Sequence, residues 1–263
     1  MNYLDTNKHY WDARVEDHSK SDFYAMDKFM AGATSLNPIE LGHLPDDLSG
    51  KRILHLQCHF GQDSLSLARM GAEVTGVDLS SEAIFKAQEV AEELNLNAKF
   101  VNCDVYSAVE HVSGQFDYVF TSYGTIGWLP DLDKWAEIIS HFLAPGGQFL
   151  IVDFHPAVWM FDDDFTHIKY SYFNRQTINE TTEGTYTDKG KDLKEAYTAW
   201  NHDLGEMFTA LLKQGLTVKS FSEYDTSPYP CFNKVVQVEN GFQIDGMEGK
   251  LPMVYALQCE KPL

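Results

Sequence analysis

A regular alternation of short apolar strands and amphipathic helices, beginning at residue 51, constrains the fold more than any other feature of the sequence. Apolar residues recur at helical spacing in three segments, at 63–70, 80–94 and 132–143. Short apolar runs flank these helices and are predicted to be strands, at 52–56, 73–77, 98–101, 116–121 and 149–154. Strands that alternate with helices form a parallel sheet covered on both faces, because each crossover is right-handed. The pattern therefore predicts a doubly wound α/β fold, with its ligand at the carboxyl ends of the strands.

The alternation breaks after the fifth strand, at residues 156–200. This segment contains YSYFNRQTINETTEGTYTD, whose alternation of polar and apolar residues predicts short antiparallel strands around a turn near Gly184. A helix is predicted again at 202–214, followed by two last strands at 216–224 and 253–259. We therefore expect a sheet of seven strands, with helices on both faces and a small antiparallel insertion after the fifth strand.

The first 48 residues differ from the rest of the chain because they are polar, aromatic and rich in helix formers. Their aromatic side chains suit either core packing or the wall of a pocket. We accordingly predict four regions: a helical lid at 1–48, a ligand-binding core at 49–155, an antiparallel insertion that caps the substrate at 156–200, and a C-terminal helix with strands that complete the sheet at 201–263.

The chain is strongly acidic, with 39 Asp and Glu residues against 20 Lys and Arg residues and a formal net charge of -19. An acidic surface repels phosphate groups, which argues against nucleic acid or an anionic membrane as a partner. Two interpretations stay open: the acids keep the protein soluble, or they attract a cationic substrate such as an amine.

Further features concern the compartment of the protein. The sequence contains no run of 18 or more apolar residues and no stretch like a signal peptide, so we expect neither a membrane span nor secretion. The four cysteines include no CxxC pair, which fits free thiols in a cytoplasmic protein.

Polar or small residues follow the predicted strands at the edge where a ligand is expected. The first strand continues as ILHLQCHFG, residues 53–61, directly into a helix, and such a turn points backbone N–H groups at a ligand. Glycine allows close approach there, and this loop keeps only Gly61. Asp78 ends the second strand, where an acid can accept the hydroxyl protons of a ribose. Asp104 ends the third strand and TSYG, residues 121–124, ends the fourth, so four loops converge on one edge of the sheet.

Several stretches together resemble the class I S-adenosylmethionine-dependent methyltransferases: VTGVDLS, NCDV, FDYVFTSYGTIGWLPDLDKW and LAPGGQFLIV. More loosely, HFGQDSLSLARMGAEVTGVDLS and DFHPAVWMF resemble a bacterial subfamily of small-molecule methyltransferases. The resemblance implies a Rossmann-like sheet of strand order 3-2-1-4-5-7-6 with an antiparallel last strand. It also implies S-adenosyl-L-methionine as the cofactor, S-adenosyl-L-homocysteine as its product, and a small-molecule methyl acceptor.

The resemblance assigns the family's loop around the methionine part of the cofactor to residues 55–61. This chain has His55 where the family usually has an acid, and Gln57 and His59 where the family has glycines, so that only Gly61 matches. The departure leaves open the path of the loop and the contact to the amino group of the cofactor. His55 also has a structural interpretation, as a histidine of the core.

The other expected cofactor contacts follow the same resemblance. Asp78 matches the acid that binds the ribose, and Leu79 is expected near the adenine. Asp104 matches the acid that accepts a hydrogen bond from the adenine amine, with the Val105 N–H serving the ring. Thr121 begins the segment that faces both cofactor and acceptor. The two acids have simpler alternatives, as the N-cap of a helix for Asp78 and as the cap of a turn for Asp104.

Methyl transfer from a sulfonium is an in-line displacement, so the protein chiefly aligns the nucleophile and excludes water. A general base is needed only where the acceptor must lose a proton early. We name two candidate catalytic residues, His155 at the end of the fifth strand and Tyr123 after the fourth. Four further residues are candidates for binding the acceptor: Tyr10, Tyr24, Trp128 and Glu223. An aromatic wall of this kind favours a cationic or planar acceptor.

No metal site is expected, because the acids at 162–164 have no recognised ligand spacing to His155 or His167. Two other functions stay open. A non-catalytic S-adenosylmethionine-binding regulatory protein is compatible with the unusual loop, and an open aromatic cavity would argue against it. An NAD(P)-dependent oxidoreductase needs GxGxxG, where this chain has Gln57 and His59.

Overall fold

The computed structural model describes residues 2–188 and 190–263. The strands of the main sheet are β1 (Arg52–Leu56), β2 (Glu73–Asp78), β3 (Ala98–Asn102), β4 (Phe116–Ser122), β5 (Leu143–Phe154), β8 (Thr217–Tyr224) and β11 (Val254–Glu260). Their order is β3-β2-β1-β4-β5-β11-β8, and β11 runs antiparallel to both of its neighbours. Counted within this sheet, the order is 3-2-1-4-5-7-6 with an antiparallel last strand, so the predicted fold class is confirmed.

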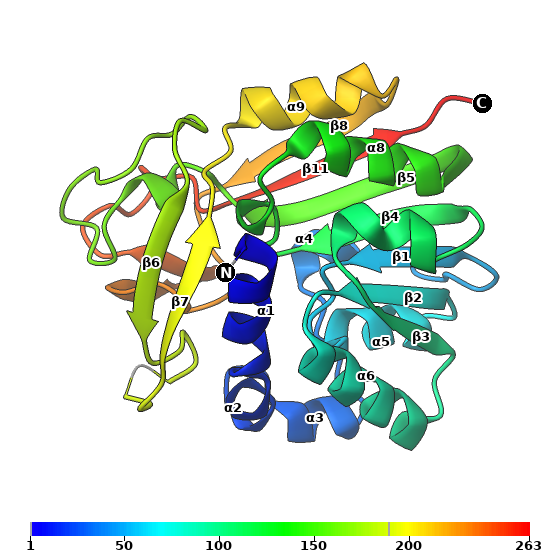
Figure 1. Ribbon diagram of the computed structural model, residues 1–263, viewed down its shortest axis with the longest axis horizontal. Coiled ribbons are helices and arrows are strands. Elements are labelled where there is room, and N and C mark those ends of the chain that lie inside the picture. The colour runs from blue at the N-terminus through cyan, green and yellow to red at the C-terminus, as the bar shows by residue number, and fades with distance from the viewer. Residues whose placement is uncertain (1, 189) are drawn as a thin grey trace.

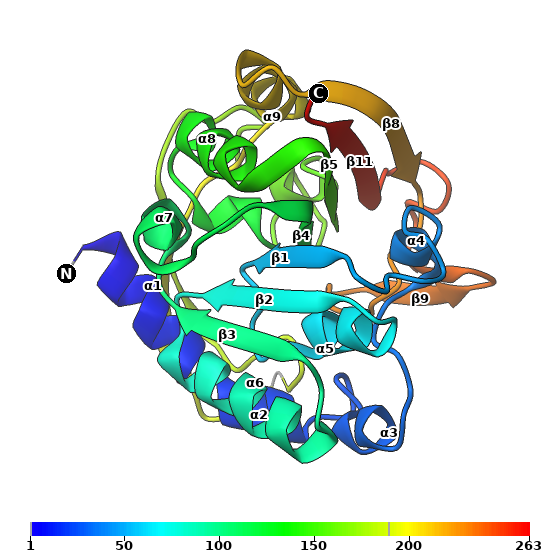
Figure 2. The same cartoon turned by 90° about the vertical axis from the view of Figure 1, so that its right-hand side faces the viewer.

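Helices cover both faces of the sheet (Figure 2). They are α1 (Tyr3–Asp12), α2 (Val15–Lys20), α3 (Met26–Met30), α4 (Pro38–Leu41), α5 (Gln62–Arg69), α6 (Ser81–Leu94), α7 (Ala108–His111), α8 (Leu132–Phe142) and α9 (Leu204–Lys213), with short 3₁₀ turns at Val105–Ser107, Ile126–Trp128 and Val158–Met160.

Side chains alternate along each strand, and this alternation divides the core between the two faces. Leu54 and Val119 belong to the cluster that includes Trp135 of α8 and residues of α9. Ile53 and Phe120, their neighbours in sequence, belong to the cluster on the opposite face. Both faces are buried, which is why the strands of this sheet have nearly continuous apolar sequences.

The helix after β2 begins where its sequence predicts. Ser80 is the N-cap of α6, and its Oγ accepts a hydrogen bond from Ala83 N at 3.0 Å. Asn95 ends the helix in the left-handed conformation at φ 51°. These local signals fix the position of α6 and of the loop that carries Asp78.

The insertion contains the predicted antiparallel pair, formed by β6 (Ile178–Glu183) and β7 (Lys194–Ala199), and Gly184 begins the connection between them. Figure 1 shows α1 standing between this hairpin and the sheet. Asn7 joins α1 to the hairpin, because its Nδ2 donates to Thr198 O and its Oδ1 accepts from Thr198 N, each at 2.8 Å. The N-terminal segment and the insertion therefore form one layer beyond the sheet edge.

The C-terminal region contains a second hairpin that the sequence analysis missed. β9 (Val235–Val238) and β10 (Gly241–Ile244) form an antiparallel pair, and they lie between β8 and β11 in the sequence. The region 201–263 thus does more than complete the sheet. The signal that predicts such a hairpin is the Asn240-Gly241 dipeptide between two short apolar runs.

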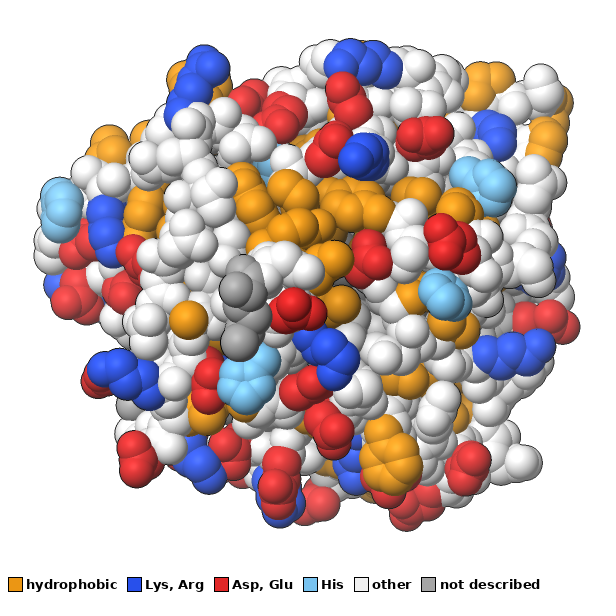
Figure 3. Space-filling view, in the orientation of Figure 1, with side chains coloured by type: hydrophobic (Ala, Val, Ile, Leu, Met, Phe, Trp, Pro, Cys, Tyr) orange, Lys and Arg blue, Asp and Glu red, His pale blue; other side chains and the backbone are white. Residues whose placement is uncertain are grey.

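Two observations on the described residues concern the surface. Within 2–188 and 190–263 no helix is both long and apolar enough to cross a bilayer. On the face seen in Figure 3, hydrophobic side chains gather between β7 and α8, and charged side chains are spread over the area around them.

Candidate active site

A cavity of about 820 Å³ lies at the carboxyl edge of the sheet, between the strand ends and the layer formed by α1 and the hairpin β6–β7. Most of the residues predicted for the site line it together: Tyr10, Tyr24, His55, Gln57, His59, Gly61, Asp78, Leu79, Asp104, Val105, Tyr123 and Trp128. Thr121, His155 and Glu223 are not among the lining residues. The cavity lies where a doubly wound sheet binds its ligand.

The loop between β1 and α5 has three residues in the left-handed region. Gln57 has φ 58°, His59 has φ 50° and Gly61 has φ 78°. A Cβ on Gly61 would lie 2.6 Å from Phe100 Cε1, so glycine is required there on two grounds. Left-handed backbone at a residue other than glycine costs about 1–2 kcal/mol. The loop therefore keeps a path that suits glycine, although Gln57 and His59 stand where the family has glycines.

Asp78 closes this loop against the second strand. Its Oδ2 accepts from His59 N at 2.7 Å and its Oδ1 accepts from Ser80 N at 2.8 Å. Burial raises the pKa of Asp78 to about 6. Each oxygen keeps a second lone pair for a ligand hydroxyl. The side chain that caps α6 is Ser80 rather than Asp78, so the carboxylate keeps this capacity.

Asp104 caps the turn at Val105–Ser107. Its Oδ1 accepts from Tyr106 N at 2.9 Å, and its Oδ2 accepts from Ser107 Oγ at 2.6 Å. The structural alternative considered for this acid is thus present, and the side chain also lines the cavity. Its contact with an adenine amine stays a prediction.

His55 and Gln57 each present an unpartnered polar atom. His55 is 2 % exposed, its Nδ1 lies 2.8 Å from Ser64 Oγ, and its Nε2 has no hydrogen-bond partner. Burial lowers the pKa of His55 to about 3, so the ring is neutral. Gln57 Nε2 donates to Thr125 O at 2.8 Å, whereas the buried Gln57 Oε1 has no partner. Buried polar atoms without partners are costly, which makes these two atoms candidates for ligand contacts.

Tyr123 follows β4 with left-handed backbone at φ 42°. Its hydroxyl donates to Glu40 Oε2 at 3.2 Å, and its ring packs edge-on against Tyr229. The next residues of this loop are fixed by Asp153, which accepts from the backbone N–H of Gly124 and from Thr125 N at 3.1 Å. Strained backbone held by surrounding contacts is typical of functional loops. The sequence analysis missed Asp153, because its role depends on a loop that is distant in the sequence.

His155 lies outside the cavity lining. Its Nδ1 accepts from Ala157 N at 3.1 Å, and its Nε2 lies 3.0 Å from Glu223 Oε1. Burial lowers the pKa of His155, although the nearby carboxylate opposes the shift. The two candidates therefore contact each other at the ends of β5 and β8, and their predicted roles have no support from this placement. Thr121 is fully buried and donates to Leu56 O at 2.9 Å, which ties β4 to β1.

An aromatic wall faces the strand ends across the cavity. Tyr10 lies 5.4 Å from Trp128 and 5.3 Å from Tyr197 between ring centroids, and Trp11 lies 5.1 Å from Trp128. Behind it, Arg14 is fully buried, stacks on the Tyr10 ring and donates to Thr182 Oγ1 at 2.9 Å. The wall thus joins α1, the loop after β4 and the hairpin β6–β7.

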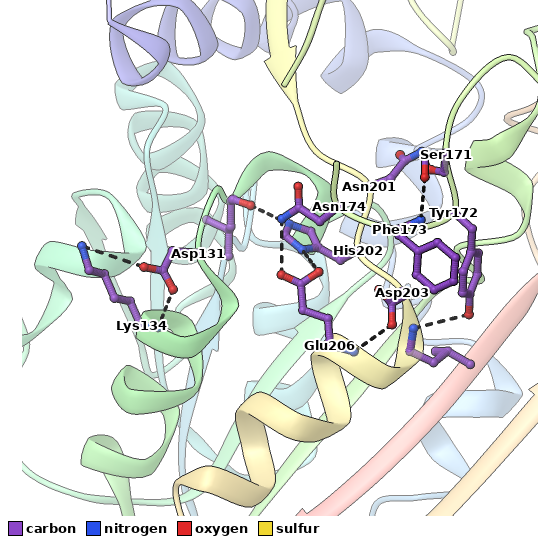
Figure 4. A network of polar contacts seen from close by, with 12 residues as sticks. Asp131, Lys134, Ser171, Tyr172, Phe173, Asn174, Asn201, His202, Asp203 and Glu206 are labelled. Atoms are coloured by element: carbon purple, nitrogen blue, oxygen red, sulfur yellow. Dashed lines mark hydrogen bonds and ion pairs between the residues drawn. The ribbon is translucent and has the colours of Figure 1, made fainter. Parts of the chain in front are cut away.

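A polar network anchors the end of the hairpin to the core (Figure 4). His202 Nε2 lies 2.7 Å from Leu129 O, and its Nδ1 lies 3.0 Å from Glu206 Oε2 on α9. Asn201 Nδ2 donates to Ser171 O at 2.9 Å. These contacts join the segment after β7 to Leu129 and to α9.

Asp162, one of the acids considered for a metal, caps a turn instead. Its side chain accepts from the backbone N–H of Thr166 at 2.7 Å and of His167 at 2.9 Å. Among the residues that the structure describes, no group of three or more His, Cys, Asp or Glu is placed to hold a metal ion.

Comparisons with known proteins agree with this geometry. Residues 53–147 match the family described as "Methyltransferase domain". A ubiquinone biosynthesis O-methyltransferase from Pectobacterium atrosepticum is 29% identical over 130 residues, which cover 48% of this chain and 54% of that protein. The chain thus spans about half the length of the curated relatives it matches.

Two solved structures share the fold. An S-adenosylmethionine-dependent methyltransferase from Clostridium acetobutylicum has a TM-score of 0.59 at 14% identity and covers 100% of both chains. Magnesium protoporphyrin IX methyltransferase from Synechocystis, with bound S-adenosylhomocysteine, has a TM-score of 0.57 at 14% identity and covers 99% of this chain and 100% of that one.

The strand order also separates this chain from the dinucleotide-binding oxidoreductases, whose order is 3-2-1-4-5-6. The matched domain, the strand order and the position of the cavity agree with one another. Residues 53–147 thus match a methyltransferase domain, and the chain as a whole has the fold of S-adenosylmethionine-dependent methyltransferases.

Proposed function

We propose that this protein transfers the methyl group of S-adenosyl-L-methionine to a small-molecule acceptor by in-line displacement. The observation that carries the proposal is one continuous cavity in which the residues expected at the cofactor and an aromatic wall lie side by side. An open cavity of this kind favours catalysis over binding alone. A nicotinamide oxidoreductase has no support from the strand order or from the matched family.

The residues present fit the cofactor. Asp78 offers a carboxylate to a ribose, Gly61 leaves the backbone open at the start of α5, and His55 Nε2 and Gln57 Oε1 are buried without partners. The cavity volume of about 820 Å³ is in the range of sites for cofactors and small molecules. S-Adenosyl-L-methionine supplies a methyl group on a positively charged sulfur, which needs no further activation.

The chain's own contribution is alignment and the exclusion of water. Asp153 holds the loop of Tyr123 and Gly124, and the wall of Tyr10 and Trp128 closes the opposite side. Orientation of this kind supplies about 7–11 kcal/mol of a barrier when the reacting atoms are well aligned. The wall is built outside the matched residues 53–147 except for Trp128, so the acceptor of the relatives does not carry over to this chain.

Calorimetric titration with S-adenosyl-L-methionine and S-adenosyl-L-homocysteine tests the cofactor, with NADH and NADPH as controls. We expect micromolar binding of the first pair alone. Small acceptors of several classes are then incubated with the protein and S-adenosyl-L-methionine, and mass spectrometry detects a gain of one CH₂. Binding without any methylated product across acceptors would favour a regulatory role, and binding of a nicotinamide would overturn the proposal.

A further inference from the structure

The further inference concerns two buried carboxylates that the sequence analysis missed. Asp63 lies in the first turn of α5 and lines the cavity. Its Oδ1 accepts from Ser35 Oγ at 2.6 Å, and its Oδ2 accepts from Ser122 Oγ at 2.9 Å. Glu40 of α4 is fully buried beside it and is reached by Asn37 and Tyr123. Residues far apart in the sequence thus enclose one acidic pair.

Neutral groups supply the hydrogen bonds that these carboxylates accept. The donors to Asp63 are two serine hydroxyls, and the donors to Glu40 are an amide and a phenol. Among the described residues that line the cavity there is no Lys and no Arg. Burial raises the pKa of Asp63, and burial together with the charge of Asp63 raises the pKa of Glu40 to about 8. A buried carboxylate without a counter-charge is costly, and a bound cation offsets that cost.

A second, independent observation points to a ligand in this cavity. His55 Nε2 and Gln57 Oε1 are buried and have no hydrogen-bond partner, and both side chains line the same cavity. Ser64, which contacts His55 Nδ1, is the residue after Asp63. A primary ammonium group has three N–H donors and no acceptor, so it matches a cavity that is lined by the Asp63 carboxylate and by the unpaired acceptor Gln57 Oε1. A carboxylate or phosphate ligand would instead meet Asp63 with no cation to balance it.

We propose that Asp63 binds a primary ammonium group in the cavity, with Glu40 as the second acid behind it. The resemblance predicts an acid at position 55, where this chain has His55, and Asp63 supplies a negative charge from α5 instead. The inference rests on the proposed function, which offers two sources of an ammonium group: the amino-acid part of the cofactor, or an amine acceptor. A spectator ammonium undergoes no covalent step, so the proposal concerns binding alone.

The test compares Asp63→Asn with wild type by calorimetry. Asparagine keeps the size of the side chain and removes its charge. The probes are S-adenosyl-L-homocysteine, which has the ammonium group, 5′-methylthioadenosine, which lacks the amino-acid part, and phenethylamine in the presence of S-adenosyl-L-homocysteine. Asp133→Asn is the matched control, because Asp133 is exposed and pairs with Lys213 away from the cavity.

If the cofactor supplies the ammonium group, Asp63→Asn lowers the affinity for S-adenosyl-L-homocysteine by about tenfold or more. The affinity for 5′-methylthioadenosine stays within about twofold of the wild-type value. If an amine acceptor supplies the ammonium group, the variant lowers the affinity for phenethylamine alone, by a similar factor. Unchanged affinity for every probe that the wild type binds overturns the proposal, as does equal weakening of S-adenosyl-L-homocysteine and 5′-methylthioadenosine.

Thermal unfolding without ligand gives a readout that does not depend on binding. Because Asp63 lacks a counter-charge, Asp63→Asn is expected to unfold at the same or a higher temperature than wild type. A lower unfolding temperature would show that Asp63 serves the fold and would count against the proposal. Failure of the wild type to bind either adenosine probe would overturn the proposed function, whereas the unfolding result would still stand.

Discussion

The two sides of the cavity are built in different ways. We propose that the loop at 57–61, Asp78 and Asp104 bind the cofactor, and we call this side of the cavity the cofactor side. The backbone of consecutive strands and loops shapes it. We propose that α1, the hairpin β6–β7 and the wall of Tyr10 and Trp128 bind the acceptor, and we call this side the acceptor side. Contacts between residues distant in the sequence hold it. Asn7 and Thr198, which join that side, are separated by 191 positions in the sequence.

The difference teaches where sequence motifs carry information. A strand followed by a helix places its loop by local rules, so the position of Asp78 follows from the sequence around it. The acceptor side depends on contacts such as that of Arg14 with Thr182, 168 positions away, which no local pattern predicts. The comparison predicts that damage to the acceptor side reduces stability and that damage to the cofactor side reduces affinity.

The largest effect that we expect from a single substitution is on stability, at Arg14 of the acceptor side. Arg14→Ala removes a fully buried side chain that donates to Tyr10 O and Thr182 Oγ1. We expect the free energy of unfolding to fall by about 3 kcal/mol, from a cavity and unpaired polar groups. Denaturant titration measures this free energy of unfolding. The control is Arg175→Ala at an exposed position, for which we expect a change below about 0.5 kcal/mol. A folded variant that loses affinity for S-adenosyl-L-homocysteine, at unchanged stability, would contradict the comparison.

The next effect concerns the cofactor side. Asp78→Ala is expected to weaken the binding free energy of S-adenosyl-L-homocysteine by about 1–3 kcal/mol, because a charged hydrogen-bond acceptor is lost. Calorimetry measures the change, and circular dichroism checks the fold, since Asp78 also accepts from His59 N and Ser80 N. Asp133→Ala is the control. Full affinity in a folded variant would remove Asp78 from the ribose site.

A pH effect tests Glu40, the buried acid near Asp63. The pKa of Glu40 is raised to about 8 in the folded state, so from about pH 4.5 to pH 8 the folded protein holds a proton that the unfolded chain has lost. Stability therefore falls as pH rises through this window, by at most about 1.4 kcal/mol per pH unit from this group. Glu40→Gln should flatten the slope in denaturant titrations between pH 5 and pH 8. An unchanged slope would show that Glu40 is already ionised at neutral pH.

The smallest expected effect concerns His155. His155→Ala removes a buried ring and its contact with the half-exposed Glu223, both of which lie outside the cavity lining. We expect unchanged affinity for the cofactor, and turnover within about twofold once an acceptor is found, because the ring does not line the cavity. Tyr123→Phe is the comparison variant, because Tyr123 lines the cavity. A tenfold loss of turnover in His155→Ala alone would restore its predicted role as a base.

The sequence predicted the fold and most of the residues that line the cavity at the strand ends, whereas their contacts with a cofactor stay predictions. Ser80 and the spacing of apolar residues after it fix the start of α6. Asp78 can then be placed at the end of the strand that precedes this helix. Asp63 and Glu40 could not be predicted, because only the folded chain brings Ser35 and Ser122 to the first turn of α5. The division into a lid and a substrate cap stays a prediction.

Two other differences have distinct causes. The hairpin β9–β10 was missed although Asn240-Gly241 signals it, because its strands have only four residues each. His155 was expected at the site because it follows β5, but its side chain contacts Glu223 on β8.

The hydrogen bonds between Asn7 and Thr198 also constrain the order in which the protein can be completed during synthesis. A ribosome adds about 5–20 residues per second, so about 10–40 s pass between the two partners. For that time α1 emerges with no hairpin to contact, while β1 to β5 can already pair. Helix α1 can therefore contact the start of α6, through Lys8 with Ser81 and Asp12 with Ser80, before its contact with the hairpin can form. A nascent chain that ends before Thr198 has strand ends that the hairpin does not yet cover.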